Sequence, residues 1–158
     1  MKKERDYIVQ ALKESGIKGK IHESMKSLRN CNEVHVGAVL RIGESFTRSG
    51  SKKRYGDKEG HLKQRNKLFE RITKLRIVIG DSNEQKVETI LTDFLKCIGK
   101  GFAVDNNWID IKIEEADWVE SDDSILKSNI AVEFDVTLTG GIYTDTDVVE
   151  AKVENIGV

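Results

Sequence analysis

Residues 130–138 read Ile-Ala-Val-Glu-Phe-Asp-Val-Thr-Leu, and two glycines follow at positions 140 and 141. Every second residue from Ile130 to Leu138 is apolar, and the positions between them include Glu133 and Asp135. Because successive side chains of a strand point to opposite faces, this pattern predicts a strand with one buried and one wet face. A sheet with one wet face is typically antiparallel and carries its helices on the other face.

Three further segments alternate in a similar way and are predicted as strands: residues 34–42, 69–79 and 108–113. Residues 43–66 separate the first two of these segments, show no periodicity and contain four glycines. A connection of this length inside a compact domain is usually functional or disordered. We therefore expect a long hairpin whose basic tip, residues 43–66, is a flexible loop.

Two segments have the apolar period of a helix. Residues 4–14 place four apolar side chains on one helical face. Residues 82–98 begin with the capping-box spacing of Ser82 and Gln85 and end before Gly99. The expected fold class is α+β, as a single domain over residues 1–158. It would hold an antiparallel or mixed sheet of about four strands, with the long basic hairpin, packed against two helices.

Composition narrows the possible functions. The chain has 158 residues, enough for one domain, and its 26 basic and 27 acidic side chains give a net charge of −1. This balance predicts neither a dedicated nucleic-acid binder nor a membrane-surface protein. No stretch approaches the roughly 18 consecutive apolar residues of a membrane span, and we expect no secretory signal. Two widely separated cysteines, Cys31 and Cys97, exclude a disulfide framework and favour a reducing cytosol.

Charge is segregated along the chain. Residues 48–76 hold eleven basic and three acidic residues, whereas residues 105–150 hold thirteen acidic and two basic residues. Either these are two solvated faces of one fold, or the basic hairpin of one subunit meets the acidic side of a neighbour. For the second interpretation, the candidate contacts are Lys52, Lys53, Arg54, Arg65 and Lys67 on the basic side, and Glu115, Asp117, Asp122 and Asp123 on the acidic side.

The usual motifs of catalysis are not found in the sequence. Residues 43–52 hold two glycines and Lys52, but their spacing is not that of a phosphate-binding loop. The three histidines have no i, i+4 partner and no nearby cysteine, and the G-x-S-x-G pattern does not occur. We therefore predict that the protein is not an enzyme and has no cofactor or metal site.

Two alternatives of another class stay open. Glu150-Ala-Lys152 and the upstream Asp135 could hold Mg²⁺ and orient a water in a metal-dependent nuclease. This E-x-K spacing arises readily by chance in a chain with 34% charged residues. The basic hairpin also contains Phe46, Tyr55 and Phe69, which could stack on the bases of a single-stranded nucleic acid.

Several short strings, taken in order, resemble one known family. After the first helix they are Gly37-Ala-Val-Leu40, Glu44-Ser-Phe46, Phe69-Glu-Arg71-Ile-Thr73, Ile77-Val-Ile79, Trp108-Ile-Asp-Ile, Ala131-Val-Glu-Phe-Asp-Val136 and Gly140-Gly-Ile-Tyr143. Over about residues 1–145 the chain looks like the tail terminator proteins of tailed bacteriophages and of phage-tail-like particles.

The resemblance implies an α+β subunit with a structural role in the virion. Tail terminators form a hexameric ring on the last ring of the tail tube, stop its polymerisation and join the tail to the neck and head. The implied partners are further copies of the chain, the tail tube protein, in some tails the sheath, and the neck or head-completion protein. No membrane and no specific nucleic acid are expected.

The expected location is the virion tail, after assembly in the host cytoplasm. Another neck, head–tail joining or tail tube protein of the same particle is the alternative.

Overall fold

The computed structural model describes residues 2–120 and 126–149. These residues form α1 (Lys2–Glu14), β1 (Ile21–His22), α2 (Met25–Arg29), β2 (Val36–Arg48), β3 (Lys52–Gly56), β4 (Leu62–Asp81), α3 (Glu84–Cys97), β5 (Gly101–Val104), β6 (Asn107–Glu120) and β7 (Ile130–Asp147). The fold is mostly β, with 53% of residues in strands and 22% in helices. The expected α+β fold, a sheet of about four strands on two helices, is therefore wrong.

The missing elements are the short ones. The segments expected as strands lie in β2, β4, β6 and β7, each of which is longer than its alternating run. The other strands of the described chain, β1, β3 and β5, have two, five and four residues. Runs this short give too few positions for an alternating pattern to be recognised.

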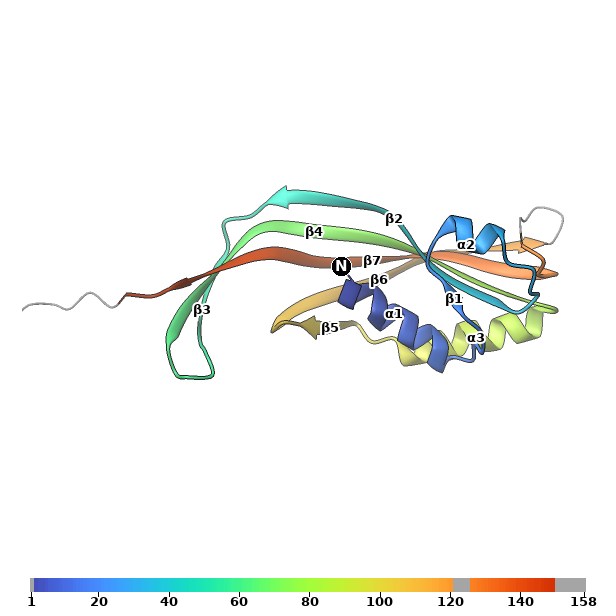
Figure 1. Cartoon of the computed structure of the whole chain (residues 1–158), viewed down its shortest axis with the longest axis horizontal. Coiled ribbons are helices and arrows are strands. Elements are labelled where there is room, and N and C mark those ends of the chain that lie inside the picture. Colours follow the sequence, from blue (N-terminus) through green and yellow to red (C-terminus); the bar gives the residue numbers. More distant parts are fainter. Residues whose placement is uncertain (1, 121–125, 150–158) are drawn as a thin grey trace, which may run out of the picture. The chain divides into compact units, whose positions relative to one another are not determined.

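The described chain has two compact units. We call residues 2–45 and 72–140 the core unit, and residues 46–71 and 141–149 the hairpin unit, in both cases for the described residues. The core unit contains α1, α2 and α3 (Figure 1). The hairpin unit contains β3 and the adjoining ends of β2, β4 and β7.

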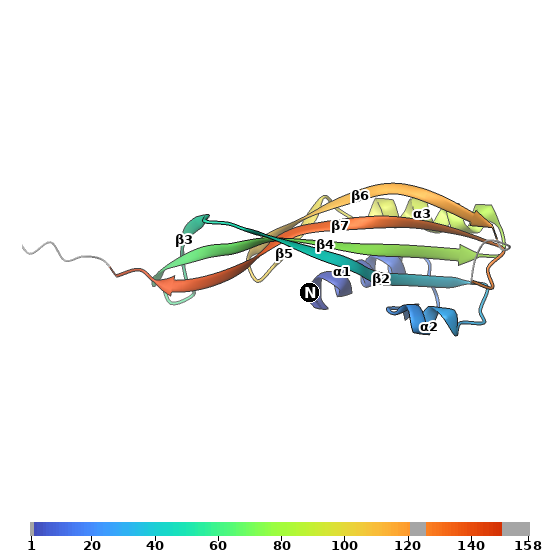
Figure 2. The ribbon, with the colours of Figure 1, turned by 90° about the horizontal axis from the view of Figure 1, so that it is seen from above.

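The sheet has the strand order β1-β2-β4-β7-β6-β5, and β3 pairs with β4. β1 and β2 are parallel, whereas the β5–β6 and β6–β7 pairs are antiparallel. In the core unit, α1 and α3 lie on one face of the sheet, and α2 lies by β2 on the other (Figures 1 and 2).

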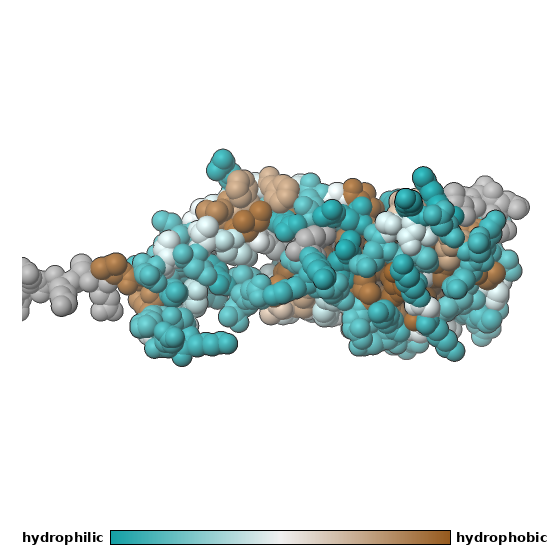
Figure 3. All heavy atoms as spheres, in the orientation of Figure 1, coloured by the Kyte–Doolittle hydropathy of each residue, from teal (hydrophilic) through white to brown (hydrophobic). Residues whose placement is uncertain are grey.

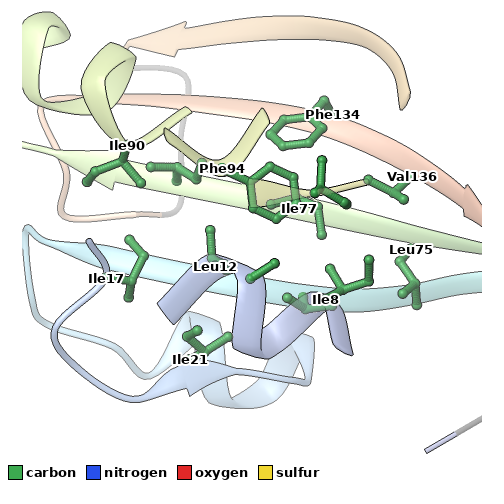
Figure 4. Packing of buried hydrophobic residues seen from close by; sticks show 14 of the residues in the cluster. Ile8, Leu12, Ile17, Ile21, Leu75, Ile77, Ile90, Phe94, Phe134 and Val136 are labelled. Atoms are coloured by element: carbon green, nitrogen blue, oxygen red, sulfur yellow. The ribbon is translucent and has the colours of Figure 1, made fainter. Parts of the chain in front are cut away.

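The main hydrophobic core lies between the sheet and the helices α1 and α3 (Figure 4). Phe94 of α3 is fully buried, and its ring centroid lies 5.6 Å from that of Phe134 on β7. Ile8 and Leu12 of α1 belong to the same cluster. The inner face expected for residues 130–138 is confirmed, because its buried members include Val132, Phe134, Val136 and Leu138.

A second, smaller cluster covers part of the opposite face. Leu28 of α2 packs there with apolar residues of β2 and β4, namely Val36, Ala38, Leu40 and Val78. The face expected to be wet is therefore dry at this end of the sheet. The sequence gives little sign of this layer, because α2 has five residues and cannot show a helical period.

Helix α3 has a different N-cap from the expected one. The side-chain oxygen of Asn83, not of Ser82, accepts the backbone N–H of Lys86 at 2.9 Å. Ser82 instead accepts a hydrogen bond from the ammonium group of Lys86 at 3.1 Å. Asparagine and serine are about equally good N-caps, so the spacing alone cannot choose between neighbouring positions.

Residues 43–66 are mostly strand rather than the expected flexible loop. β2 continues to Arg48, β3 follows, and β4 already begins at Leu62. The turn between β3 and β4 is short: Gly60 has a φ of +81°, and Asp57 Oδ1 accepts the backbone N–H groups of Glu59 and His61. Polar side chains on both faces of this hairpin remove the apolar alternation by which strands are recognised.

Replacing Gly101 with alanine should destabilise the β5–β6 pair. A Cβ atom at Gly101 would lie 2.4 Å from the carbonyl oxygen of Ile109 and 2.5 Å from the ring of Trp108. Because a backbone atom has to move, we expect a loss of about 1–3 kcal/mol in the free energy of unfolding. Chemical denaturation measures it, with Gly43→Ala as the control, since a Cβ at Gly43 meets nothing within 4 Å. Equal stability of the two variants would contradict the pairing.

Candidate interaction site on the hairpin unit

Two cation–π pairs join β2 to β4 in the hairpin unit. The guanidinium carbon of Arg48 lies 5.2 Å from the ring centroid of Phe69, and that of Arg71 lies 5.9 Å from that of Phe46. A backbone hydrogen bond from Ser49 to Leu68 sets these residues opposite one another. Contacts of this kind add about 0.5–1 kcal/mol each at exposed sites, and they explain why a polar segment forms a sheet here.

Arg65, one of the expected partner contacts, is held inside the hairpin unit. It donates two hydrogen bonds to Asp145 on β7, at 2.7 and 2.8 Å, and its side chain is 17% exposed. Its guanidinium carbon lies 4.9 Å from the ring centroid of Tyr55 and 5.9 Å from that of Tyr143. Bidentate arginine–carboxylate pairs fix geometry as well as charge, so Arg65 positions β3, β4 and β7.

The Arg65 guanidinium lowers the pKa of Asp145 to about 2. Folding therefore gains stability from this carboxylate above its unfolded pKa of about 3.9, and the gain is lost as the pH falls toward 2. We expect an NMR titration of the Asp145 carboxyl carbon to show its midpoint near pH 2. The same titration in an Arg65→Gln variant should return the midpoint toward the ordinary value. A midpoint near the ordinary value in the unchanged protein would contradict the pairing.

The three cations of β3 are exposed. Lys52, Lys53 and Arg54 stand opposite Asn66, Arg65 and Gln64 of β4. Among residues 2–120 and 126–149 no ion-pair partner is found for these three, in contrast to Lys63, which lies 3.6 Å from Asp147. Lys67 lies 3.7 Å from Glu70 and is 23% exposed. Lys52, Lys53 and Arg54 are thus the candidate cations that no carboxylate of the described residues neutralises.

Apolar side chains are also exposed on the hairpin unit. Phe46 is 51% exposed, and Leu68 and Ile142 are 40% and 37% exposed. Figure 3 shows apolar atoms gathered over β2 and β4 of this unit. Single exposed apolar residues are normal, but a group of them on a small unit is typical of an interaction surface. The sequence does not reveal this group, because a loop without periodicity gives no faces on which to place its side chains.

The acidic candidates lie on the core unit. Glu115 and Asp117 of β6 line a small hollow of about 120 Å³ together with Glu133, Asp135 and Arg76. Arg76 hydrogen-bonds to both oxygens of Asp135, at 2.9 and 3.3 Å, and this contact with the nearby acidic charges raises the pKa of Arg76. Glu115 and Asp117 are both exposed. Asp122 and Asp123, the other two acidic candidates, lie outside the described residues.

A larger hollow of about 820 Å³ opens beside the start of α3 on the core unit. Within it, His35 Nε2 accepts the backbone N–H of Lys18 at 3.1 Å, and Nδ1 pairs with Asp81 at 2.8 Å. Burial alone would raise the pKa of Asp81, but hydrogen bonds from His35 and from the Ser82 backbone hold that pKa below its ordinary value. Both ring nitrogens are occupied, so His35 joins the elements around it and is not placed as a base.

One group of side chains in the described part of the chain has metal-ligand spacing. Asp57, Glu59 and His61 bring one ligand atom each to within 4.8 Å of one another in the β3–β4 turn. Asp57 already uses its Oδ1 atom to accept two backbone N–H groups of that turn. For the nuclease alternative, Asp135 is hydrogen-bonded to Arg76, and Glu150 and Lys152 lie outside the described residues.

Comparison of the sequence with protein-family models and with curated proteins yields no match. In the described ranges, none of the helices combines the length and the apolar character that a bilayer crossing needs. The hairpin unit, with its exposed cations and exposed apolar side chains, is the candidate interaction site of the described chain.

Proposed function

We propose that the protein is a structural subunit of a phage tail, a tail terminator that forms a hexameric ring on the end of the tail tube. The ring stops polymerisation of the tube and joins the tail to the neck and head. The proposal takes its identity from the sequence resemblance and its physical support from the hairpin unit. The observation that carries it is the exposed basic strand β3, Lys52–Gly56, whose cations have no ion-pair partner in the described chain.

A polar subunit of this kind assembles head to tail. Cations lie on the hairpin unit, and the exposed carboxylates of Glu115 and Asp117 lie on the core unit. A contact between two different patches is heterologous, and repetition of such a contact gives a ring when the rotation closes. Complementary charge also disfavours a symmetric contact, because such a contact would bring two basic patches or two acidic patches together.

The exposed apolar side chains of the hairpin unit are candidate contacts with the tube or neck protein. Phe46, Leu68 and Ile142 give the hairpin unit a surface that a tube or neck protein can cover. Aromatic residues that become buried at an interface carry much of the binding energy, so Phe46 is the strongest anchor in this group.

Light scattering of the purified protein, alone and with sheared tail tubes, tests the proposal. We expect six times the chain mass, or single rings at tube ends in electron micrographs. A monomer that ignores tubes would overturn the proposal. A ring that binds inside the neck and not at tube ends would identify the chain as another neck or head–tail joining protein.

A nucleic-acid binder is the second candidate, favoured by the aromatic rings that lie beside guanidinium groups in the hairpin unit. Phe46, Tyr55 and Phe69 pair with Arg71, Arg65 and Arg48. Binding to single-stranded oligonucleotides that falls steeply with salt would support this candidate, since phosphate contacts release counterions. Cleavage that needs a divalent metal and is lost in Glu150→Gln would support the nuclease alternative instead.

A further inference from the structure

We infer that neighbouring copies join by continuing the β-sheet: strand β3 of one hairpin unit pairs with the end of β7 in the next copy. This inference rests on the proposed self-assembly. It makes the carboxylates at the end of β7, rather than Glu115 and Asp117 of the core unit, the acidic groups that β3 meets. Within the described chain, β3 is paired with β4 alone. The β6–β7 ladder ends at the pair Asp110–Thr139, so residues 141–147 of β7 lie beyond it. The hairpin unit thus has two open strand edges, and open edges are templates for pairing.

The backbone of β3 is oriented for such pairing. Ser51 accepts a hydrogen bond from Lys67, and Asp57 donates one to His61. These bonds mark residues 51 and 57 as positions that face β4, and the alternation of an antiparallel ladder places residues 53 and 55 with them. Lys52, Arg54 and Gly56 therefore direct their N–H and C=O groups toward the open edge.

The end of β7 also leaves one of its edges open. Val148 donates its N–H to Leu62, while Arg65 meets Asp145 and Lys63 meets Asp147 across the two strands. The strands are therefore antiparallel, with residues 144, 146 and 148 facing β4. Tyr143, Asp145 and Asp147 direct their backbone groups to the other side, where none of the described strands lies.

Charge decides which edges pair. The β3 edge carries Lys52, Lys53 and Arg54, which have no ion-pair partner in the described chain. The β7 edge carries Asp147, which is 82% exposed and 3.6 Å from Lys63, and Asp145, which is paired with Arg65. Two β3 edges would set three cations against three, and two β7 edges would set carboxylates together. Like charges on neighbouring strands are destabilising, so both symmetric dimers are disfavoured. The pairing of β3 with β7 brings opposite charges together.

The pairing of β3 with β7 joins two different edges, so it is heterologous. The directions of the two strands make it a parallel pairing. β3 and the end of β7 are each antiparallel to β4, so the two open edges of one copy run in the same direction. A second copy in the same orientation then places its β7 edge along the β3 edge of the first. Each copy uses both edges once, and the contact repeats until a ring closes.

Cross-linking of two single-cysteine variants tests this contact. In a Cys31→Ser, Cys97→Ser background, one variant carries Arg54→Cys and the other Asp147→Cys, and a short bismaleimide spans the neighbouring registers of the two strands. We expect a cross-linked dimer in the mixture and none in either variant alone. A dimer in the Arg54→Cys variant alone, or in the Asp147→Cys variant alone, would overturn the pairing in favour of a symmetric one.

A proline variant tests the backbone contribution. Arg54→Pro removes an outward N–H and leaves the bonds of β3 to β4 in place, whereas Arg54→Ala removes the same charge and keeps the N–H. We expect light scattering to show the assembled mass for Arg54→Ala and at least a tenfold weaker assembly for Arg54→Pro. Equal assembly of these two, or a ring without the mixed cross-link, would overturn the edge contact and leave the proposed ring intact. An unsubstituted chain that stays monomeric and also ignores tail tubes would overturn both.

Discussion

Replacing Phe134 with alanine is expected to lower the free energy of unfolding by about 3–5 kcal/mol, the usual cost of truncating a buried aromatic residue. Phe134 is 2% exposed, and its ring faces that of Phe94 at a centroid distance of 5.6 Å (Figure 4). Truncation removes the contact between β7 and α3 and leaves a cavity between them. Chemical denaturation followed by circular dichroism measures the loss.

Phe46→Ala is the matched control for Phe134→Ala. Phe46 is also a phenylalanine on a strand, but it is 51% exposed and lies in the hairpin unit. Its truncation should cost no more than about 1 kcal/mol, which is the value of its cation–π contact with Arg71. Equal losses for the two variants would mean that the inner face of β7 is assigned wrongly.

The elements predicted correctly are those in which buried side chains recur at regular intervals along the sequence. On β7 and α3 the core takes every second residue or every third and fourth, so the periodicity alone identifies Phe134 and Phe94 as buried. Strand β3 has the opposite character. Its three cations are exposed, and Tyr55 makes a cation–π contact with Arg65 of the neighbouring strand, so neither face of β3 shows an apolar period.

Arg65 illustrates why the site could be predicted only in part. Its position in a basic segment is plain in the sequence, but its partner Asp145 is 80 positions away. That pairing depends on the approach of β7 to β4, so no local pattern separates Arg65 from the exposed Lys53 opposite it. The charge composition predicts a basic surface. The pairing of the strands determines which cations, such as Arg65, form ion pairs within the hairpin unit.

Reversing Lys52, Lys53 and Arg54 together to glutamate is expected to abolish ring formation while the fold is kept. All three are exposed and have no ion-pair partner in the described chain, so the circular dichroism spectrum should not change. The matched control reverses Lys13, Lys20 and Lys26, which are exposed on the core unit and change the net charge equally. Light scattering should show the ring for the control and a monomer for the β3 variant. Assembly of both variants would remove the basic strand from the mechanism.

A second substitution, Asp147→Lys, tests whether β3 of one copy contacts the β7 edge of the next copy. Asp147 is 82% exposed on the β7 edge, so Asp147→Lys makes that edge less acidic without disturbing the Arg65–Asp145 pair. The β3-reversed chain has two acidic edges, and the Asp147→Lys chain has a basic edge that meets a weakened one, so each should assemble poorly alone. In an alternating ring of the mixture, the basic β3 edge of the Asp147→Lys chain meets an acidic β7 edge. The acidic β3 edge of the reversed chain meets the β7 edge that is no longer net acidic, so the repulsion is relieved at every contact and the mass of the ring should return. Because surface charge is screened within about 10 Å at 0.1 M salt, the rescue should be strongest at low salt. A mixture that stays monomeric at low salt would show that the carboxylates of β7 are not what β3 meets.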